Sequence, residues 1–234
     1  MGTQATVSEV KRRPARWSTT MLVVFGPTLV MLLVSGFLVY ILHYSTTGLD
    51  FAYAYVLATV AMLLVFVLIV GLLLKQEGSS LLHLINLDPV QLPKQLVIGV
   101  IVCVIRLAIA VVYTSILSGA GAHASPIILQ GFPYLFALVV GSTVAGFCIE
   151  IIWRGYGITH LETLTKSTLW AVVISTIGSA LWRLDPLVIG SNILGGLLFS
   201  SIYVKMRSLV PVIIGHWSRD IIGYLFQYLP FTKF

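Results

Sequence analysis

Long runs of apolar residues, separated by short polar segments, dominate this chain of 234 residues. A helix needs about 20 mostly apolar residues to cross the hydrocarbon core of a membrane. Only 9% of the residues are charged, against about 25% in soluble domains, and 58% are hydrophobic. The pattern predicts an all-α polytopic membrane protein of about seven transmembrane helices, at residues 18–44, 51–74, 96–117, 134–153, 169–184, 187–204 and 209–229.

The basic residues predict how the chain is oriented in the membrane. Positively charged residues accumulate in cytoplasmic loops. With the amino terminus inside, the inner segments would carry Lys11, Arg12, Arg13, Arg16, Lys75, Lys94, Arg154, Lys166, Lys205 and Arg207, whereas an outer segment would carry Lys233 alone. We therefore expect a multi-pass protein of the plasma membrane with a cytoplasmic amino terminus. The formal charge of +6 is spread between apolar runs, which argues against nucleic acid as a partner.

The chain divides into two parts by composition. Residues 1–17 form a basic segment that we expect in the cytoplasm, and residues 18–234 form a single transmembrane domain. A cleaved signal peptide is the alternative for the start of the chain, but the apolar run is too long and lacks a small-residue cleavage site. The segment 75–95 is rich in leucine and contains Pro89 and Pro93, so we expect a short interfacial helix followed by a bend.

Several ionisable side chains fall within or beside the predicted spans. Such groups are costly in lipid and by default mark a functional site. They are Arg106, Glu150, Arg154, Arg183, Asp185, His216, Arg219 and Asp220. The spacing of four places Glu150 beside Arg154 and His216 beside Asp220 on one helix face each. The alternative is that these charges are simple ion pairs between helices, and for Arg106 alone a snorkelling or pairing role is the better interpretation.

The remaining candidate ligands point to no cofactor and no metal ion. Four histidines lie near loops or span ends, where a surface or interfacial position is expected: His43, His83, His123 and His160. Cys103 and Cys148 lie inside apolar segments, where we expect them to be small buried hydrophobic residues. The sequence contains no zinc motif and no phosphate-cradling glycine loop.

Three short segments resemble the motifs of a known family of membrane proteases. They are Ile149-Glu150-Ile151-Ile152-Trp153-Arg154-Gly155-Tyr156, Ser179-Ala180-Leu181-Trp182-Arg183 and His216-Trp217-Ser218-Arg219-Asp220. In order and spacing they resemble the CPBP family, the intramembrane CAAX-processing and bacteriocin-processing proteases. That family carries a Glu-Glu pair with Arg four residues later, then Phe-x-x-x-His, then His-x-x-x-Asn or Asp. The resemblance implies a CPBP-like helical bundle with its motif core at residues 149–224.

Two positions depart from the family pattern. Ile149 stands where the resemblance places the water-activating glutamate, and Arg183 stands where it places the histidine of the second motif. Isoleucine supplies no base, and arginine stays protonated with no lone pair to offer. If the motifs converge, Glu150 and Asp220 face Arg154 and Arg183, with His216 between them. We therefore predict a degenerate site with no catalytic residue. The position of the family's catalytic centre would be occupied by a core of salt bridges.

Three classes of function are open at this point. The first is a pseudoprotease that acts as an accessory or scaffold subunit of a larger membrane complex, in transport or envelope processing, with another integral membrane protein and lipids as partners. The second is an atypical intramembrane protease for prenylated or leader peptides, with Glu150 as base, His216 and Asp220 orienting water, and Arg183 stabilising the oxyanion. The third is a bacteriocin-immunity or small-molecule carrier protein.

Overall fold

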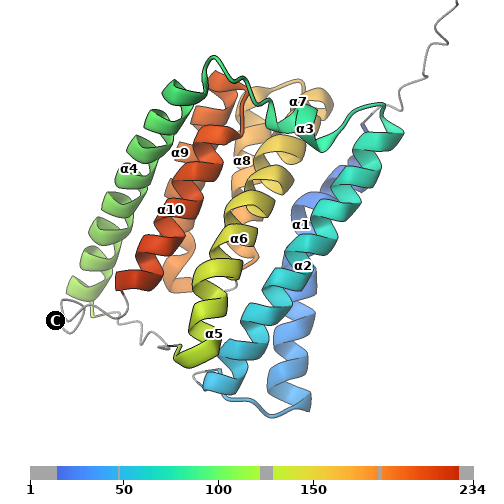
Figure 1. Ribbon diagram of the computed structural model, residues 1–234. Helices are drawn as coiled ribbons and strands as arrows, with labels where there is room; N and C mark the ends of the chain where they lie inside the picture. The colour runs from blue at the N-terminus through green and yellow to red at the C-terminus, as the bar shows by residue number, and fades with distance from the viewer. Residues whose placement is uncertain (1–14, 47, 122–128, 184–185, 227–234) are drawn as a thin grey trace, which may run out of the picture.

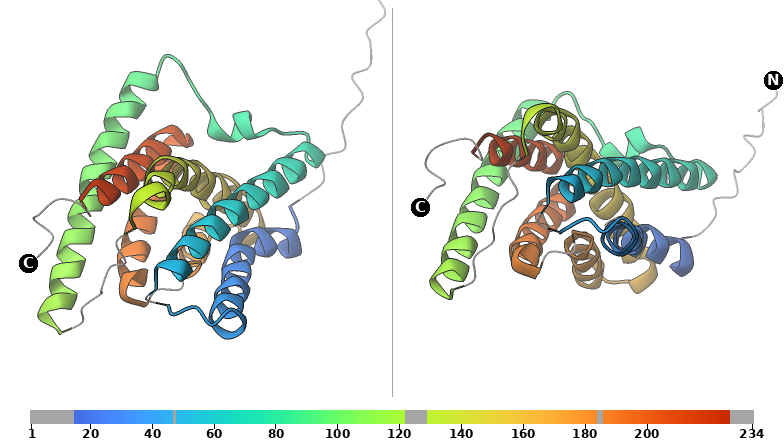
Figure 2. Two further views of the ribbon diagram at one scale, coloured as in Figure 1. Left: turned by 60° about the horizontal axis from the view of Figure 1, so that its bottom comes forward. Right: turned by 90° about the horizontal axis from the view of Figure 1, so that it is seen from below.

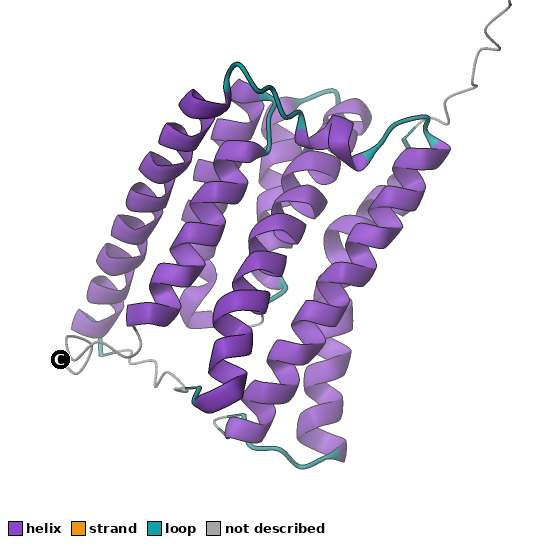
Figure 3. Ribbon diagram, in the orientation of Figure 1, coloured by secondary structure: helices purple, strands orange, loops and turns teal. Residues whose placement is uncertain are grey.

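The computed structural model describes residues 15–46, 48–121, 129–183 and 186–226, without the side chains of residues 186 and 187. Over these ranges the chain is helical, with turns between helices and no strand (Figure 3). The predicted all-α membrane fold is thereby confirmed. Most of the basic amino-terminal segment 1–17 lies outside the described residues, as do His123, Asp185 and Lys233.

The helices form two packed layers, which Figures 1 and 2 show from three sides. The first layer contains α2 (Leu49–Gln76), α6 (Ser142–Ile149), α10 (Val210–Phe226) and α4 (Leu92–Gly119). The second layer contains α1 (Trp17–Gly36), which continues into the π-helical turn η1 (Phe37–Ile41), and also α8 (Thr168–Leu181) and α9 (Pro186–Met206). Helix α4 lies at one edge beside α10, and α1 and α2 pair at the other edge.

Five described helices are long and apolar enough to cross a membrane, namely Trp17–Ile41, Leu49–Gln76, Leu92–Gly119, Gly131–Thr165 and Val188–Met206. Helix α8 is apolar but has 14 residues, and the described part of α10 has 17. A 17-residue helix is about 26 Å long, which is close to the thickness of the hydrocarbon core. The polytopic architecture is therefore established, and the number seven stays a prediction.

The helix of the fourth predicted span is longer than the sequence indicated. It runs without a break through α5 (Gly131–Phe136), η2 (Ala137–Gly141), α6, η3 (Glu150–Ile158) and α7 (Thr159–Thr165). The predicted end at residue 153 was wrong, because no proline or cap follows it, and the helix ends where Lys166 takes a left-handed φ of 56°. Arg154 therefore lies inside the bundle and is not one of the loop charges that predict orientation.

A short helix fixes the turn that precedes α10. Residues Leu81–Ile85 form α3, and Asn86 ends it in the left-handed region, so the predicted short helix and bend are confirmed. The Ile85 carbonyl accepts a hydrogen bond from the Leu209 amide at 3.0 Å, and Asn86 Nδ2 donates to the Arg207 carbonyl at 2.9 Å. These contacts hold the first turn of α10 in place. Pro211 lies in this turn, where the amide hydrogen that proline lacks would have no partner within the helix.

The core of the bundle surrounds η3. All nine residues of this π-helical segment are buried. Trp153 Nε1 donates to the Val24 carbonyl of α1 at 2.9 Å, and Ser175 Oγ of α8 donates to the Trp153 carbonyl at 2.6 Å. Two helices of the second layer therefore hold the segment that carries the first motif, which gives its side chains fixed positions.

Candidate functional site

The first motif places a carboxylate and a guanidinium in the centre of the bundle. Glu150 is 0% exposed and Arg154 is 2% exposed, so neither reaches bulk solvent. Arg154 Nε lies 3.4 Å from Glu150 Oε2, an ion pair without hydrogen-bond geometry. Arg154 also lies 5.7 Å from the centre of the Phe199 ring and donates to the Gly196 carbonyl at 3.5 Å. Both polar groups of this motif are thus bound to partners within the protein.

His216 of the third motif connects the two carboxylates. Its Nδ1–H donates to Glu150 Oε1 at 2.6 Å, and its Nε2 lies 3.5 Å from Asp220 Oδ2. The ring is 7% exposed and stacks on Phe199 at 5.5 Å. A carboxylate therefore lies at each ring nitrogen, and His216 bridges the two acidic side chains of the site.

The arginine that pairs with Asp220 is its neighbour in the chain. Arg219 NH1 donates to Asp220 Oδ1 at 2.5 Å, whereas no ion pair within 4 Å joins Arg183 to a carboxylate among the described residues. Arg219 thus adds a third arginine to the predicted cluster of Glu150 and Asp220 with Arg154 and Arg183. Arg219 was recognised as an intramembrane charge, and its position beside Asp220 in the chain was the available signal for the pairing.

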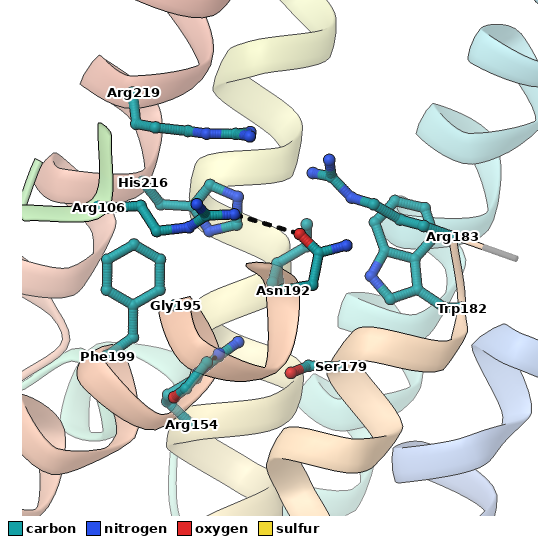
Figure 4. Close-up of a pocket in the computed structure, with 12 residues that line it drawn as sticks. Arg106, Arg154, Ser179, Trp182, Arg183, Asn192, Gly195, Phe199, His216 and Arg219 are labelled. Carbon is teal, nitrogen blue, oxygen red and sulfur yellow. Dashed lines mark hydrogen bonds between the residues drawn. The ribbon is translucent and has the colours of Figure 1, made fainter. Parts of the chain in front are cut away.

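Arg183 nevertheless reaches the same site from the end of α8. Its guanidinium lies 5.3 Å from the centre of the Trp182 ring, and its carbonyl accepts a hydrogen bond from the Tyr55 hydroxyl at 3.1 Å. Figure 4 shows the guanidinium on the pocket side of Trp182. The residue at the position of the family's second histidine therefore faces the cluster.

A small, partly open pocket with a cavity volume of about 30 Å³ lies at the centre of these groups (Figure 4). Ile149, 2% exposed, is one of its lining residues and presents an apolar side chain beside His216. The full lining is Arg106, Ile149, Arg154, Ser179, Trp182, Arg183, Asn192, Gly195, Gly196, Phe199, His216 and Arg219. The pocket thus brings together residues of all three motifs.

Arg106 enters this pocket from outside the motifs. It is 4% exposed and donates from NH1 to Ser191 Oγ at 3.0 Å and from NH2 to Asn192 Oδ1 at 3.2 Å. A Cβ atom at Gly195 would collide with its guanidinium, so this glycine makes room for it. Arg106 is therefore a pairing residue and does not snorkel. Asn192 was not foreseen, because a lone asparagine in an apolar run carries no motif.

One histidine lies elsewhere than predicted. His160 is 7% exposed rather than at the surface. Its Nδ1 lies 2.9 Å from the Tyr156 carbonyl oxygen, and its Nε2 lies 2.8 Å from Glu77 Oε2. It joins α7 to the end of α2 and lies outside the pocket lining. The extension of the fourth span explains the error, because the sequence placed this residue in a loop.

The chemistry of the described site is that of a donor-rich, ion-paired cavity. Both carboxylates already accept from His216 or an arginine, and the lining groups are mainly guanidinium, amide and hydroxyl donors. No group of three or more His, Cys, Asp and Glu in the described ranges could hold a metal ion. Glu150 and Asp220 do not converge on one point, because His216 lies between them.

Comparison with known proteins agrees with the motifs. Residues 131–222 match the family described as "Type II CAAX prenyl endopeptidase Rce1-like". The match covers about two fifths of the chain and contains every motif residue of the site, while α1, α2 and α4 lie outside it. No curated protein and no solved structure matches the chain. Residues 131–222 of this membrane protein therefore form an Rce1-like domain of the CAAX prenyl protease, or CPBP, family.

Proposed function

We propose that this CAAX protease-like protein is catalytically degenerate and acts as an accessory or scaffold subunit of a larger membrane complex, in transport or envelope processing. The observation that supports the proposal most is the position of Ile149. Ile149 lines the same pocket as His216, at the chain position where the family resemblance places the glutamate that activates water. A hydrocarbon side chain there can neither accept a proton nor hold a water for attack.

The remaining polar groups support the same interpretation. Glu150 would be the natural substitute base, but it accepts from His216 and pairs with Arg154. Both interactions depend on the negative charge of Glu150, so this side chain serves as a counter-ion to its neighbours. The cluster is then a structural network that joins η3 to α10.

Extensive apolar surface is available for a partner within the membrane. Helix α4 forms one edge of the bundle, and much of its surface is exposed, including Val97, Ile101, Val104, Val111 and Ile116. Exposed apolar residues on α2 form a second such surface, with Leu57, Leu64, Leu68 and Leu72. A transmembrane helix of another protein, or lipid, matches surfaces of this composition.

Gentle native purification of the tagged chain from its own membrane, followed by mass spectrometry, tests the scaffold role. We expect a membrane protein at a fixed stoichiometry, and its recovery should fall when bulky polar residues replace Ile101 and Val104 on the exposed side of α4. The same changes in Leu64 and Leu68 of α2 show which of the two surfaces binds. A chain that emerges alone from mild detergent and from native nanodiscs would contradict the accessory role.

An atypical protease is the second candidate, because His216 is bonded to Glu150 and adjacent to Asp220 beside an open pocket. In that reaction Glu150 would take the proton of the attacking water, and Arg183 would stabilise the oxyanion. This requires Glu150 to leave its ion pair with Arg154. The activity would disappear in Glu150→Gln.

A further inference from the structure

We propose that the pocket of the Rce1-like domain binds the phosphate monoester group of an anionic ligand, with a membrane lipid as the source. The inference rests on the proposed function in one respect, namely that the pocket no longer hydrolyses peptides. It goes beyond that function by assigning the pocket a ligand of stated chemistry.

The first argument is the charge around the pocket. Four guanidinium groups line it, from Arg106, Arg154, Arg183 and Arg219. Only two carboxylates among the described residues pair with this cluster, those of Glu150 and Asp220, and both also contact His216. Arg106 and Arg154 are buried, and Arg183 and Arg219 are partly buried. An excess of cations at such a site is unfavourable in a membrane-embedded bundle unless an anion or water compensates it. The excess corresponds to the charge of a phosphate monoester near neutral pH, about −1.5 to −2.

The second argument is the geometry of the donors. The guanidinium groups come from different elements, so Arg106 on α4, Arg183 after α8 and Arg219 on α10 surround the space from different sides (Figure 4). Asn192 adds a buried Nδ2 that has no hydrogen-bond partner among the described residues. Planar guanidinium forks match phosphate oxygens with two parallel hydrogen bonds each. The pocket therefore offers more donors than its own acceptors use.

The third argument favours phosphate over the terminal carboxylate of a peptide. A carboxylate brings one negative charge and two oxygens, whereas a phosphate monoester brings nearly two charges and three free oxygens. The Arg219 side chain is 24% exposed while that of Arg154 is 3% exposed, so the arginine cluster is accessible at one end. A ligand whose apolar tail stays in the membrane can place its head group at that end.

Native mass spectrometry of the full chain, purified in detergent, measures the binding directly. The probes are phosphatidic acid as the lipid monoester, phosphatidylcholine as a zwitterionic lipid, and inorganic phosphate. We expect phosphatidic acid to bind at one per chain and phosphatidylcholine to bind weakly. Arg183→Gln should weaken phosphatidic acid binding about tenfold, as for loss of a charged hydrogen-bonding group. Arg183→Lys, which keeps the charge and loses the fork, should lie between Arg183→Gln and the unmodified chain.

Arg207→Gln is the matched control, because Arg207 pairs with Glu162 at the surface and does not line the pocket. It should leave the binding unchanged. Tight binding of inorganic phosphate that phosphatidic acid cannot displace would support the phosphate chemistry and identify a free phosphate as the source. Equal binding of both lipids, or binding that Arg183→Gln and Arg207→Gln weaken equally, would overturn the proposal.

The test is independent of the proposed loss of catalysis. If phosphatidic acid fails to bind and no peptide is cleaved, the ligand is wrong and the degenerate site stands. If peptides are cleaved, the proposed function fails whatever the lipid does.

Discussion

At the residue scale, two residues of the pocket differ from those that the family resemblance implies, while the other polar side chains of the motifs contact one another. Ile149 presents a hydrocarbon side chain where the family resemblance places a carboxylate, and Arg183 presents a permanent cation where it places a titratable imidazole. The retained Glu150 is then the anion on which Arg154 and His216 depend. A side chain that serves as a fixed counter-ion is a poor general base. If it took up a proton, its buried partners would lose the negative charge that balances them.

We predict that Glu150→Gln destabilises the protein strongly. Removal of one member of a buried ion pair in water-soluble proteins costs about 3–5 kcal/mol, because the partner stays buried and charged. Thermal unfolding in detergent should therefore occur at a clearly lower temperature. Glu162→Gln is the control, because its partner Arg207 is 47% exposed, and a surface pair contributes about 0–1 kcal/mol. Equal shifts for the two variants would contradict the counter-ion role.

The surface pair itself predicts a response to pH. The hydrogen bonds that Arg207 donates to Glu162 raise the pKa of Arg207 above its ordinary value. A raised pKa in the folded state means that the stabilisation is present below the unfolded pKa and is lost only above it. Unfolding of Glu162→Gln and of the unmodified chain should thus differ by the same amount at pH 6 and pH 9. A difference that grows between these values would show that another group is involved.

At the element scale, close approaches between helices set the geometry of the site. A Cβ atom at Gly146 of α6 would lie 2.8 Å from Trp217 Cβ and 3.0 Å from Trp217 Cα of α10. The backbones of the two helices therefore touch next to His216, which allows its ring to reach Glu150. The π-helical register of η3 adds a second adjustment, and such segments are frequent at functional sites.

Gly146→Ala should separate α6 from α10 and lengthen the contact between His216 and Glu150. Overpacking of a close contact costs about 1–3 kcal/mol, here because backbone atoms rather than a flexible side chain must move. Thermal unfolding should report the loss. Gly36→Ala is the matched control, since nothing in the described part of the chain lies within 4 Å of a Cβ at that position. Unchanged stability of Gly146→Ala would show that the helices are not in contact there.

At the scale of the whole molecule, basic residues at the ends of several helices lie at the same end of the bundle. Lys75 lies in the last turn of α2, Lys94 in the first turn of α4, and Lys166 directly after α7. Lys205 lies in the last turn of α9, and Arg207 follows that helix. These positions share the end of the bundle that carries α3 and α7 (Figure 1). By the positive-inside rule this end faces the cytoplasm, which is an expectation about the membrane rather than a property of the fold.

Cysteine labelling in intact cells tests that orientation. Lys94→Cys and Lys166→Cys should be protected from a membrane-impermeant thiol reagent, and Ala120→Cys at the other end of α4 should react. The native Cys103 and Cys148 are 3% and 5% exposed, so they should contribute little background. Reaction of Lys94→Cys with protection of Ala120→Cys would reverse the orientation. Reaction of Lys94→Cys with protection of Lys166→Cys would contradict the predicted even number of spans between them.

The sequence predicted those features that depend on local pattern. Apolar runs indicated the helical membrane fold, and the spacing of four placed Glu150 beside Arg154 and His216 beside Asp220. Features that depend on how helices pack could not be read in this way. The contact of Arg106 with Ser191 and Asn192 needs the crossing of α4 over α9, and the extension of the fourth helix follows from burial of residues 154–158.

The central claim is that this pocket no longer hydrolyses peptides, and a cleavage assay tests it most directly. The purified chain in nanodiscs is incubated with prenylated and leader peptides, beside Glu150→Gln and empty nanodiscs, and the products are measured by mass spectrometry. We predict that the unmodified chain, Glu150→Gln and empty nanodiscs give the same product level, because Ile149 leaves no base for water. Cleavage by the unmodified chain that disappears in a folded Glu150→Gln variant would contradict the account and establish a protease.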